Sequence, residues 1–462
     1  MTELVLVRPG RSSRAELHWS KAVPLGIGYL AASARAAGID VAIVDGKILG
    51  HDSLEETVAA IRQLNPTLVG LSALTVELAS ARAIARALKD IKPAVITILG
   101  GAHANALPGE TLANAPEFDY LMSGESESSL VAFVNAVKAG AMPTNIPGLW
   151  QRNADGACAR QSPARYDHEI AALPFPAWDL FHRQDIYPII AERGCPYRCV
   201  FCSNNMAHKI RSRPIGHIVA ELEWLHRQFA PSWVYFEDET FGLRKDATAE
   251  LLGRIVEFNR RKGIRFKAQT RIDAITPKLA SLMKQSGFEY LEIGVESGDQ
   301  EVLTLSKKGI RADAIADAVA TVKHAGIKPW VNFIIGLPGE TAQTVRSSIN
   351  LAVRLNPERL SVAIIVAYPG TEIYSWALAN KNGYRLLSQD WSRFDKYLSA
   401  SVELENLPYS TMRRLQLQMY GETYLRNLRL GDFLNLIWTS RSFAMPILKS
   451  LLNHSNKSHQ QN

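Results

Sequence analysis

The stretch that decides the fold is Glu-Arg-Gly-Cys-Pro-Tyr-Arg-Cys-Val-Phe-Cys, at residues 192–202. It contains Cys195, Cys199 and Cys202, three of the four cysteines in the chain. Cysteine thiolates are the usual ligands of iron–sulfur clusters. Three thiolates on one loop can hold three irons of a four-iron cluster and leave the fourth iron open to a bound molecule. We therefore predict an iron–sulfur cluster at this loop.

Two other uses of these thiols stay open. A disulfide would leave one cysteine of the three without a partner. A structural zinc needs a fourth ligand, which Cys158 or His208 could supply. Zinc modules usually place their ligands in paired knuckles, so one cysteine-rich loop matches zinc less well than it matches a cluster.

The composition is that of a globular chain with sizeable cores. Of 462 residues, 47% are hydrophobic and 21% are charged, which suggests roughly two to four domains. The net charge of +7 is dispersed, so nothing demands a nucleic-acid partner. The clustered cysteines favour a reducing compartment over a disulfide scaffold. The first residues read as a strand rather than a signal peptide, and no apolar run approaches the roughly 20 residues of a membrane span. We expect a cytoplasmic protein.

Residues 1–140 alternate apolar strands with helical patterns. We predict strands at residues 4–7, 41–45, 68–72, 94–99 and 120–122, and helices at 26–37, 54–64, 81–89 and 127–138. A capping box at Ser53–Glu56 begins the second helix. Strands that are apolar along nearly their whole length predict a doubly wound parallel sheet.

Small and polar residues follow four of these strands. Ligands of such sheets bind beyond the carboxyl ends of the strands. Each loop taken alone is ordinary turn chemistry, but together the loops form a candidate binding edge. Its residues are Asp45, Ser72, Thr75, Gly100, Gly101, His103, Gly124 and Glu125.

A connector is predicted at residues 141–185. Ala154–Gly156 is a hairpin turn signal that places Cys158 on a short strand, away from the other cysteines. The proline-rich stretch 173–180 predicts an extended, rigid linker.

A second alternating pattern predicts a partial (β/α)6 barrel at residues 186–390. Its strands are expected at 188–192, 233–236, 266–270, 290–295, 330–335 and 360–365. Catalytic and binding residues of barrels lie at the carboxyl ends of the strands. The candidates there are Asp238, Glu239, Arg271, Glu296 and Ser297. Three carboxylates in a row at 237–239 are costly unless a ligand or solvent meets them, so a solvated acidic loop is the alternative.

Residues 391–462 predict a small helical region, with helices at 411–428 and 433–452. The last helix sets apolar residues beside Arg441 and Lys449. Such a helix either packs over the barrel or lies on a membrane surface.

The spacing Cys-x3-Cys-x2-Cys, with Phe201 before the third cysteine, resembles the radical S-adenosylmethionine superfamily. That resemblance implies a [4Fe–4S] cluster on the three cysteines and S-adenosylmethionine on its open iron. It assigns the methionine amino group to Asp238 and Glu239, the methionine carboxylate to Arg271, and the ribose to Glu296 and Ser297. The expected chemistry is one-electron cleavage to a 5′-deoxyadenosyl radical, supported by a flavodoxin- or ferredoxin-type electron donor.

The N-terminal loops resemble the cobalamin-binding domain that precedes many of these enzymes. The resemblance implies a Rossmann-like domain in which the eight loop residues named above approach the corrin or its tail. The Asp-x-His-x-x-Gly motif of proteins that ligate cobalt through histidine does not occur. His103 is therefore either a cobalt ligand outside that motif or a loop hydrogen-bonder.

Together these resemblances imply cobalamin-dependent methylation of an unactivated carbon in a small-molecule substrate. Oxidative cyclisation or ring rearrangement with the same cofactors is the alternative, and a non-catalytic metal-binding protein is a more distant one. The segment Tyr424–Asn427 resembles the helical tail of the anaerobic magnesium-protoporphyrin monomethyl ester cyclase. The apolar tail points to a lipid, isoprenoid or tetrapyrrole substrate. No motif identifies the substrate or a catalytic residue beyond those that hold cofactors.

Overall fold

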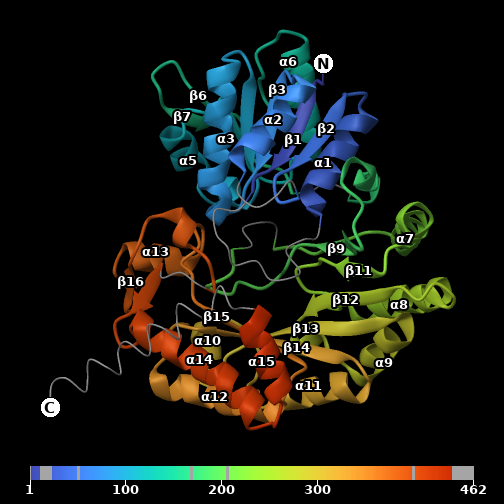
Figure 1. The fold of residues 1–462 in the computed structure, drawn as a ribbon, viewed down its shortest axis with the longest axis vertical. Helices are drawn as coiled ribbons and strands as arrows, with labels where there is room; N and C mark the ends of the chain where they lie inside the picture. Colours follow the sequence, from blue (N-terminus) through green and yellow to red (C-terminus); the bar gives the residue numbers. More distant parts are fainter. Residues whose placement is uncertain are drawn as a thin grey trace.

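The computed structural model describes residues 2–10, 23–48, 53–166, 170–203, 208–397 and 401–439. Two large sheets organise the chain (Figure 1). One belongs to the N-terminal part and the other to the centre, and the C-terminal helices lie against the second.

The first sheet has the strand order β2-β1-β3-β4-β5-β6-β7. Its parallel strands are β1 (Leu4–Arg8), β2 (Val41–Asp45), β3 (Leu68–Ser72), β4 (Ile96–Gly100) and β5 (Tyr120–Met122). Alternate residues of β1 enter two different cores. Leu4 and Leu6 pack with helices α1 (Leu25–Ala36) and α6 (Glu127–Lys138). Val5 and Val7 pack with α2 (Leu54–Leu64) and α3 (Leu78–Ile91). Burial on both faces is the reason for the near-continuous apolar strands, and it confirms the predicted doubly wound sheet.

The connector contributes more to this sheet than we predicted. The hairpin of β6 (Leu149–Arg152) and β7 (Cys158–Arg160) adds two antiparallel strands at the β5 edge. The stretch 173–180 is also more than an extended linker, because Trp178 begins the short 3₁₀ helix η4 (Trp178–Leu180) and is fully buried. A Cβ on Gly28 would lie 3.0 Å from the Trp178 ring, so α1 approaches the linker closely only through a glycine.

The second sheet is fully parallel, with the order β15-β14-β13-β12-β11-β8. The strands are β8 (Ile186–Ile189), β11 (Trp233–Phe236), β12 (Arg265–Thr270), β13 (Phe288–Glu296), β14 (Lys328–Ile335) and β15 (Arg359–Ile364). Helices α7 (Ile215–Phe229), α8 (Lys245–Asn259), α9 (Pro277–Ser286), α11 (Ala314–His324) and α12 (Ala342–Leu355) run along one side of it (Figure 1). This open, curved sheet confirms the partial barrel.

The C-terminal region packs back on both parts. Helix α14 (Tyr409–Leu425) lies against α12 and β15, and α15 (Leu430–Thr439) follows it. Trp391, in the 3₁₀ helix η6 (Trp391–Arg393), packs against Tyr374 of α13 (Glu372–Leu378), with 6.0 Å between ring centres, and against His103 of the N-terminal part, with 5.4 Å. The predicted last helix begins earlier than expected, and residues 440–452 of that prediction lie outside the described residues. Among the helices that the structure describes, none is long and apolar enough to cross a membrane.

Candidate active site

A two-stranded ladder closes the cysteine segment at its base. Strands β9 (Glu192–Arg193) and β10 (Arg211–Ser212) pair antiparallel, so the three cysteines lie in the loop between the two strands. Hydrogen bonds connect this loop to residues that follow strands of the second sheet. We call that sheet and its helices the half-barrel, and the edge at which its strands end the mouth. The N–H of Gly194 donates to Glu239 Oε2 (3.1 Å), and the N–H of Val200 donates to the carbonyl of Ser306 (3.2 Å). The segment therefore lies at the carboxyl end of the second sheet.

The donor set of this segment fits an iron–sulfur cluster. Cys195, Cys199 and Cys202 carry reduced thiols, and the N–H of Cys202 donates to the carbonyl of Cys199 in a tight turn (3.0 Å). Cys158, by contrast, lies on the edge strand β7. Among the described residues, no three acidic, histidine or cysteine side chains converge as metal ligands do. The three thiols would therefore have to move closer together to hold a cluster.

Arg271 reaches the cysteine segment from β12. Its guanidinium lies 3.5 Å from the ring centre of Tyr197, and its Nε and Nη2 each donate to Asp273 at 3.0 Å. The Tyr197 hydroxyl donates to the same carboxylate at 2.9 Å. Arg271 was predicted to bind the methionine carboxylate, but in this structure its guanidinium is already engaged by these two partners and by the Lys308 carbonyl. Its geometry is that of a residue that holds the cysteine loop.

Asp238 and Glu239 contact the backbone that leads into the loop. Asp238 Oδ1 accepts from the N–H of Ala191 at 2.7 Å, while its buried Oδ2 has no hydrogen-bond partner among the described residues. Burial raises the pKa of Asp238 well above its usual range, against the backbone N–H donors of Ala191 and Glu192. An unpartnered buried carboxylate oxygen at the cluster loop is the kind of group that an ammonium ligand would satisfy.

A polar cluster on the inner wall of the half-barrel was not predicted. Lys267 Nζ lies 3.2 Å from Glu292 Oε2 and over the rings of Tyr235 and Trp330, at 4.6 Å from each ring centre. Asn332 Nδ2 donates to Glu292 Oε1 at 2.9 Å. Each of the strands β11 to β14 contributes a side chain to this cluster. Lys267 and Glu292 alternate with buried apolar neighbours, a pattern that could have revealed the cluster in the sequence.

Glu237 extends this wall towards the mouth. It follows β11 and keeps the alternation of Trp233 and Tyr235. Its side chain is open to solvent and yet surrounded by protein, as on a concave wall. Burial raises the pKa of Glu237 to about 7, an effect that Lys267 opposes and Glu239 reinforces.

Glu296 and Ser297, at the end of β13, face different surroundings. Glu296 Oε1 lies 2.8 Å from Lys308 Nζ, and both groups are buried near Cys199. Ser297 is completely buried, and its hydroxyl lies 3.2 Å from that of Ser348 on α12. Glu296 is thus brought to the cysteine segment, whereas Ser297 is held in the protein interior.

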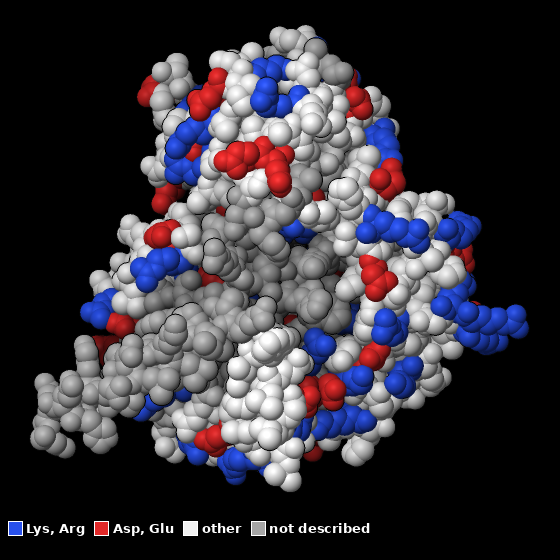
Figure 2. All heavy atoms as spheres, viewed as in Figure 1, with Lys and Arg blue, Asp and Glu red and all other residues white. Residues whose placement is uncertain are grey.

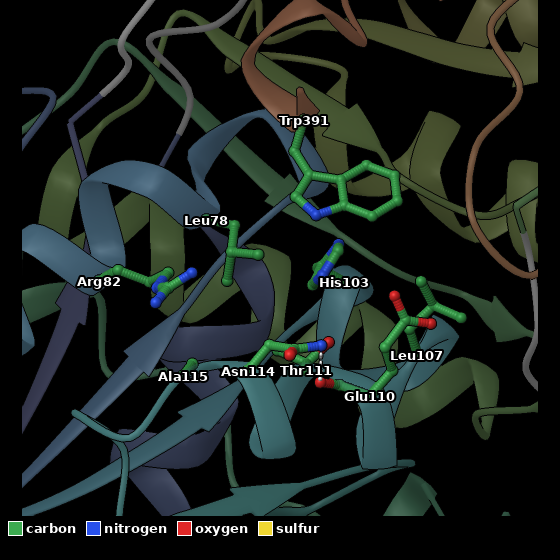
Figure 3. Close-up of a pocket in the computed structure, with 9 residues that line it drawn as sticks. All are labelled: Leu78, Arg82, His103, Leu107, Glu110, Thr111, Asn114, Ala115 and Trp391. Atoms are coloured by element: carbon green, nitrogen blue, oxygen red, sulfur yellow. Dashed lines mark hydrogen bonds between the residues drawn. The ribbon is translucent and has the colours of Figure 1, made fainter. Parts of the chain in front are cut away.

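At the edge of the first sheet, two predicted residues pair inside the fold. His103, on α4 (Ala102–Ala106), is 1% exposed, and its Nδ1 lies 3.3 Å from the Thr75 hydroxyl. The ring of Trp391 meets His103 edge-on, with 5.4 Å between ring centres (Figure 3). Burial lowers the pKa of His103 to about 4. These contacts favour a loop hydrogen-bonder over a cobalt ligand.

His103 and Trp391 border a small cavity of about 50 Å³, which also reaches α5 (Pro108–Asn114). Arg82, Glu110 and Asn114 give it a polar rim (Figure 3). The Thr111 hydroxyl on this cavity is buried and has no hydrogen-bond partner among the described residues. A few water molecules would fit the space and satisfy that hydroxyl.

The remaining predicted residues at this edge of the first sheet differ in how accessible they are to a ligand. Asp45 is buried in an ion pair with Arg8, whose Nε donates to it at 2.7 Å. Gly101 has a φ of 94°, and a Cβ there would lie 2.7 Å from the Ala73 nitrogen and 3.0 Å from the Ser72 hydroxyl. A Cβ on Gly100 would meet nothing closer than 3.9 Å, so that backbone is open to a neighbour. Glu125 is buried and accepts a hydrogen bond from Arg211 of the ladder.

Two families match the chain. Residues 20–134 match the B12 binding domain, and residues 189–352 match the radical SAM superfamily. An uncharacterized methyltransferase of Pyrococcus horikoshii is 28% identical over 436 residues, which are 92% of this chain and 93% of that protein. The anaerobic magnesium-protoporphyrin IX monomethyl ester cyclase of Rubrivivax gelatinosus is 26% identical over 370 residues, which are 76% of this chain and 65% of the cyclase.

The fold is also that of a solved structure. The radical S-adenosylmethionine methyltransferase TsrM of Kitasatospora setae, solved with cobalamin and a [4Fe–4S] cluster bound, superposes with a TM-score of 0.73. The match covers 91% of both chains at 17% sequence identity. The chain is therefore a radical SAM enzyme that carries an N-terminal B12-binding domain.

Proposed function

We propose that this enzyme uses cobalamin, a [4Fe–4S] cluster and S-adenosylmethionine to methylate an unactivated carbon of a small molecule. The main observation behind the proposal is a direct contact between the candidate cluster site and the candidate cobalamin site. A segment with three reduced cysteines lies at the mouth of the half-barrel, and Glu125, in the loop after β5 of the B12-binding domain, accepts a hydrogen bond from Arg211 at the base of this segment. The methyltransferase names of the Pyrococcus and Kitasatospora proteins support this reaction.

The chain offers distinct residues for each cofactor. Cys195, Cys199 and Cys202 would hold the cluster, and the unpartnered Oδ2 of Asp238 would accept from the S-adenosylmethionine ammonium. Glu296 would accept from the ribose, and Arg271 would keep the cysteine loop in place. When bound, the cofactors supply an electron, a carbon radical and a methyl group, and the protein supplies position and exclusion of water. We propose that no histidine of this edge ligates cobalt, because His103 is enclosed by Thr75 and Trp391.

The polar residues on the inner wall of the half-barrel indicate what kind of substrate could bind there. The buried Lys267 pairs with the half-buried Glu292, to which the half-buried Asn332 donates, and the exposed Glu237 extends this cluster to the mouth. A purely hydrocarbon substrate would displace water from these polar groups without offering them new hydrogen bonds. We therefore favour a substrate with polar substituents, such as a tetrapyrrole with carboxylate side chains, over an unsubstituted isoprenoid.

The proposal is tested without knowing the substrate. The full-length protein is reconstituted anaerobically with iron, sulfide and hydroxocobalamin, then reduced in the presence of S-adenosylmethionine. We expect 5′-deoxyadenosine, which reports radical formation, and S-adenosylhomocysteine, which reports methyl transfer from S-adenosylmethionine. Cys199→Ala should abolish 5′-deoxyadenosine, whereas Cys158→Ala on β7 should leave it unchanged. A yield that does not depend on Cys199 would contradict the proposal.

Oxidative cyclisation is the second candidate, because the Rubrivivax cyclase matches 76% of the chain. S-adenosylhomocysteine separates the two, since a cyclase without methyl transfer forms none. With a candidate substrate in hand, a product that gains one methylene unit supports methylation, and a product that loses hydrogens supports cyclisation.

The C-terminal helix supports a contact outside the active site. Helix α15 turns Phe433 and Leu436 towards the core but exposes Leu430, Leu434 and Trp438, which are 56–69% accessible. An uncharged strip occupies this place on the surface (Figure 2). We propose that the strip contacts membrane lipid peripherally. Co-sedimentation of the protein with lipid vesicles should then fall for Leu434→Glu.

We also propose that a flavodoxin- or ferredoxin-type protein delivers the electron. A purified donor of this type should then replace dithionite as the reductant in the reconstituted assay.

A further inference from the structure

The base of the cysteine segment carries two arginines that face each other. In the β9–β10 ladder, Arg193 pairs with Arg211 and Glu192 pairs with Ser212. Like charges directly opposite in a ladder destabilise it. This ladder is only two residues long in each strand, so the repulsion has to be neutralised from elsewhere.

The neutralising charges come from the B12-binding domain. Arg211 makes a two-pronged contact with Glu125, with Nη1 donating to Oε2 at 2.7 Å. Arg193 Nη2 lies 2.7 Å from Glu127 Oε1, and its Nη1 lies 3.7 Å from Glu125. We call Glu125 and Glu127 the carboxylate clamp. Its four charged side chains are only 2–13% exposed, so each charge depends on its partners rather than on water.

The local backbone of the B12-binding domain brings the carboxylate clamp to the β9–β10 ladder. Gly124 has a φ of 88°, and a Cβ there would meet Ala164 at 2.6 Å, so the turn that directs Glu125 to the ladder requires glycine. Glu127 is the first residue of α6. On the far side of Arg193, the ring of Tyr29 on α1 lies 5.0 Å from the guanidinium. Three elements of the B12-binding domain thus hold one end of the cysteine segment.

From this geometry we propose that Glu125 is a positioning residue that couples the two cofactor sites. It binds the base of the cysteine segment through Arg211, while its neighbour Gly124 belongs to the loop predicted to meet cobalamin. Ordering of that loop by a corrin therefore orders the cysteine segment, and closing of the segment on a cluster orders the loop. The inference rests on the proposed function only for the identity of the cofactors. It replaces the predicted contact of Glu125 with cobalamin.

The test compares three full-length variants. Glu125→Gln keeps the shape of the side chain and removes its charge, and Glu125→Asp keeps the charge and shortens the reach. Asp179→Asn is the matched control, because Asp179 joins the same B12-binding domain to the linker through Arg35 (2.8 and 3.1 Å), but both side chains are nearly half exposed.

The first measurement is amide hydrogen exchange of residues 194–203 in cluster-reconstituted protein. Glu125→Gln should speed exchange there by roughly tenfold or more, as expected when a buried, hydrogen-bonded ion pair is lost. Glu125→Asp should have a smaller effect and Asp179→Asn none. Peptides of β13 provide the reference for correct folding. Exchange at residues 194–203 that matches the wild type in Glu125→Gln would overturn the inference.

The second measurement is the affinity for hydroxocobalamin with and without the cluster. Coupled sites change each other's affinity by about fivefold or more, so the wild type should show such a ratio and Glu125→Gln a ratio near one. A wild-type ratio of one, or an unchanged ratio in the variant, would contradict the coupling. Loss of cobalamin binding in Glu125→Gln with or without cluster would instead identify a direct contact. Failure of the proposed function is recognised separately, as absence of 5′-deoxyadenosine in the wild type.

Discussion

Glu296 and Lys308 form a buried ion pair beside the cysteine segment, with 2.8 Å between the carboxylate oxygen and the ammonium nitrogen. Both side chains are less than a tenth exposed. Glu296 has a φ of 67°, a left-handed conformation that costs a residue with a side chain about 1–3 kcal/mol. The strain lies at the position where a ribose contact is predicted, so Lys308 holds a candidate binding residue in an unfavourable backbone state.

Replacing Lys308 should therefore destabilise the half-barrel. Lys308→Met leaves the Glu296 carboxylate buried without its partner, and we expect the free energy of unfolding to fall by about 3 kcal/mol. The neighbouring Lys307 pairs with Glu372, but these side chains are 54% and 44% exposed. Lys307→Met should change the free energy of unfolding by less than about 0.5 kcal/mol. Equal losses in the two variants, measured by urea denaturation, would show that the Glu296–Lys308 pair has no special role.

The ring and the hydroxyl of Tyr197 make separable contributions to the cysteine loop. Tyr197→Phe keeps the ring under Arg271 and loses the hydrogen bond to Asp273, worth about 1 kcal/mol, so iron release to a chelator should quicken by about fivefold. Tyr197→Leu also loses the cation–π contact, so release should quicken by at least about tenfold. Release rates that are the same in both variants and the wild type would mean that Arg271 does not hold the loop.

Much of the fold could be predicted because the strands of the first sheet are apolar along nearly their whole length and those of the second sheet are separated by clear helical patterns. The segments Tyr120–Met122, Glu127–Lys138 and Trp233–Phe236 coincide with the predicted elements. Strand β8 begins two residues before the predicted strand and ends three residues before it, because the apolar pattern continues through Ile190 and Ala191 after the strand has ended. The hairpin at residues 149–160 was predicted, but its pairing with β5 is a long-range contact that local pattern does not reveal.

The candidate site was harder to predict for a similar reason. The position of Glu125 in its motif predicts a contact with the corrin. In the structure, Glu125 binds Arg211, which is 86 residues away in the chain. Arg271 was assigned to a cofactor, although Tyr197 and Asp273 already engage it. For both residues the structure shows protein partners that the motif does not reveal, and the predicted cofactor contacts stay predictions. The assignment of the three cysteines to a cluster stays a prediction.

Gly101 should be intolerant of a side chain for two reasons. Its φ of 94° is unfavourable for alanine, and a Cβ would lie 2.7 Å from the Ala73 nitrogen and 2.8 Å from its oxygen. We expect Gly101→Ala to cost about 2–4 kcal/mol of stability and to weaken cobalamin binding. Gly156 in the hairpin turn has a φ of 82°, but a Cβ there would meet nothing within 4 Å, so Gly156→Ala should cost only about 1 kcal/mol. Thermal unfolding of both variants measures the difference, and equal losses would exclude the clash.

His103 should make the B12-binding domain sensitive to acid. Burial lowers its pKa from 6.5 to about 4, so the unfolded chain takes up a proton in a range where the folded chain does not. The resulting stability is fully present above pH 6.5 and is lost as the pH falls towards 4, by about 3 kcal/mol. His103→Asn can keep a hydrogen bond to Thr75 without titrating, so its stability should fall less than that of the wild type over this range. His182 is exposed, and His182→Asn should follow the wild type. Denaturation midpoints at pH 7, 5.5 and 4.5 measure the effect, and a wild-type curve parallel to that of His103→Asn would mean that His103 is protonated freely in the folded protein.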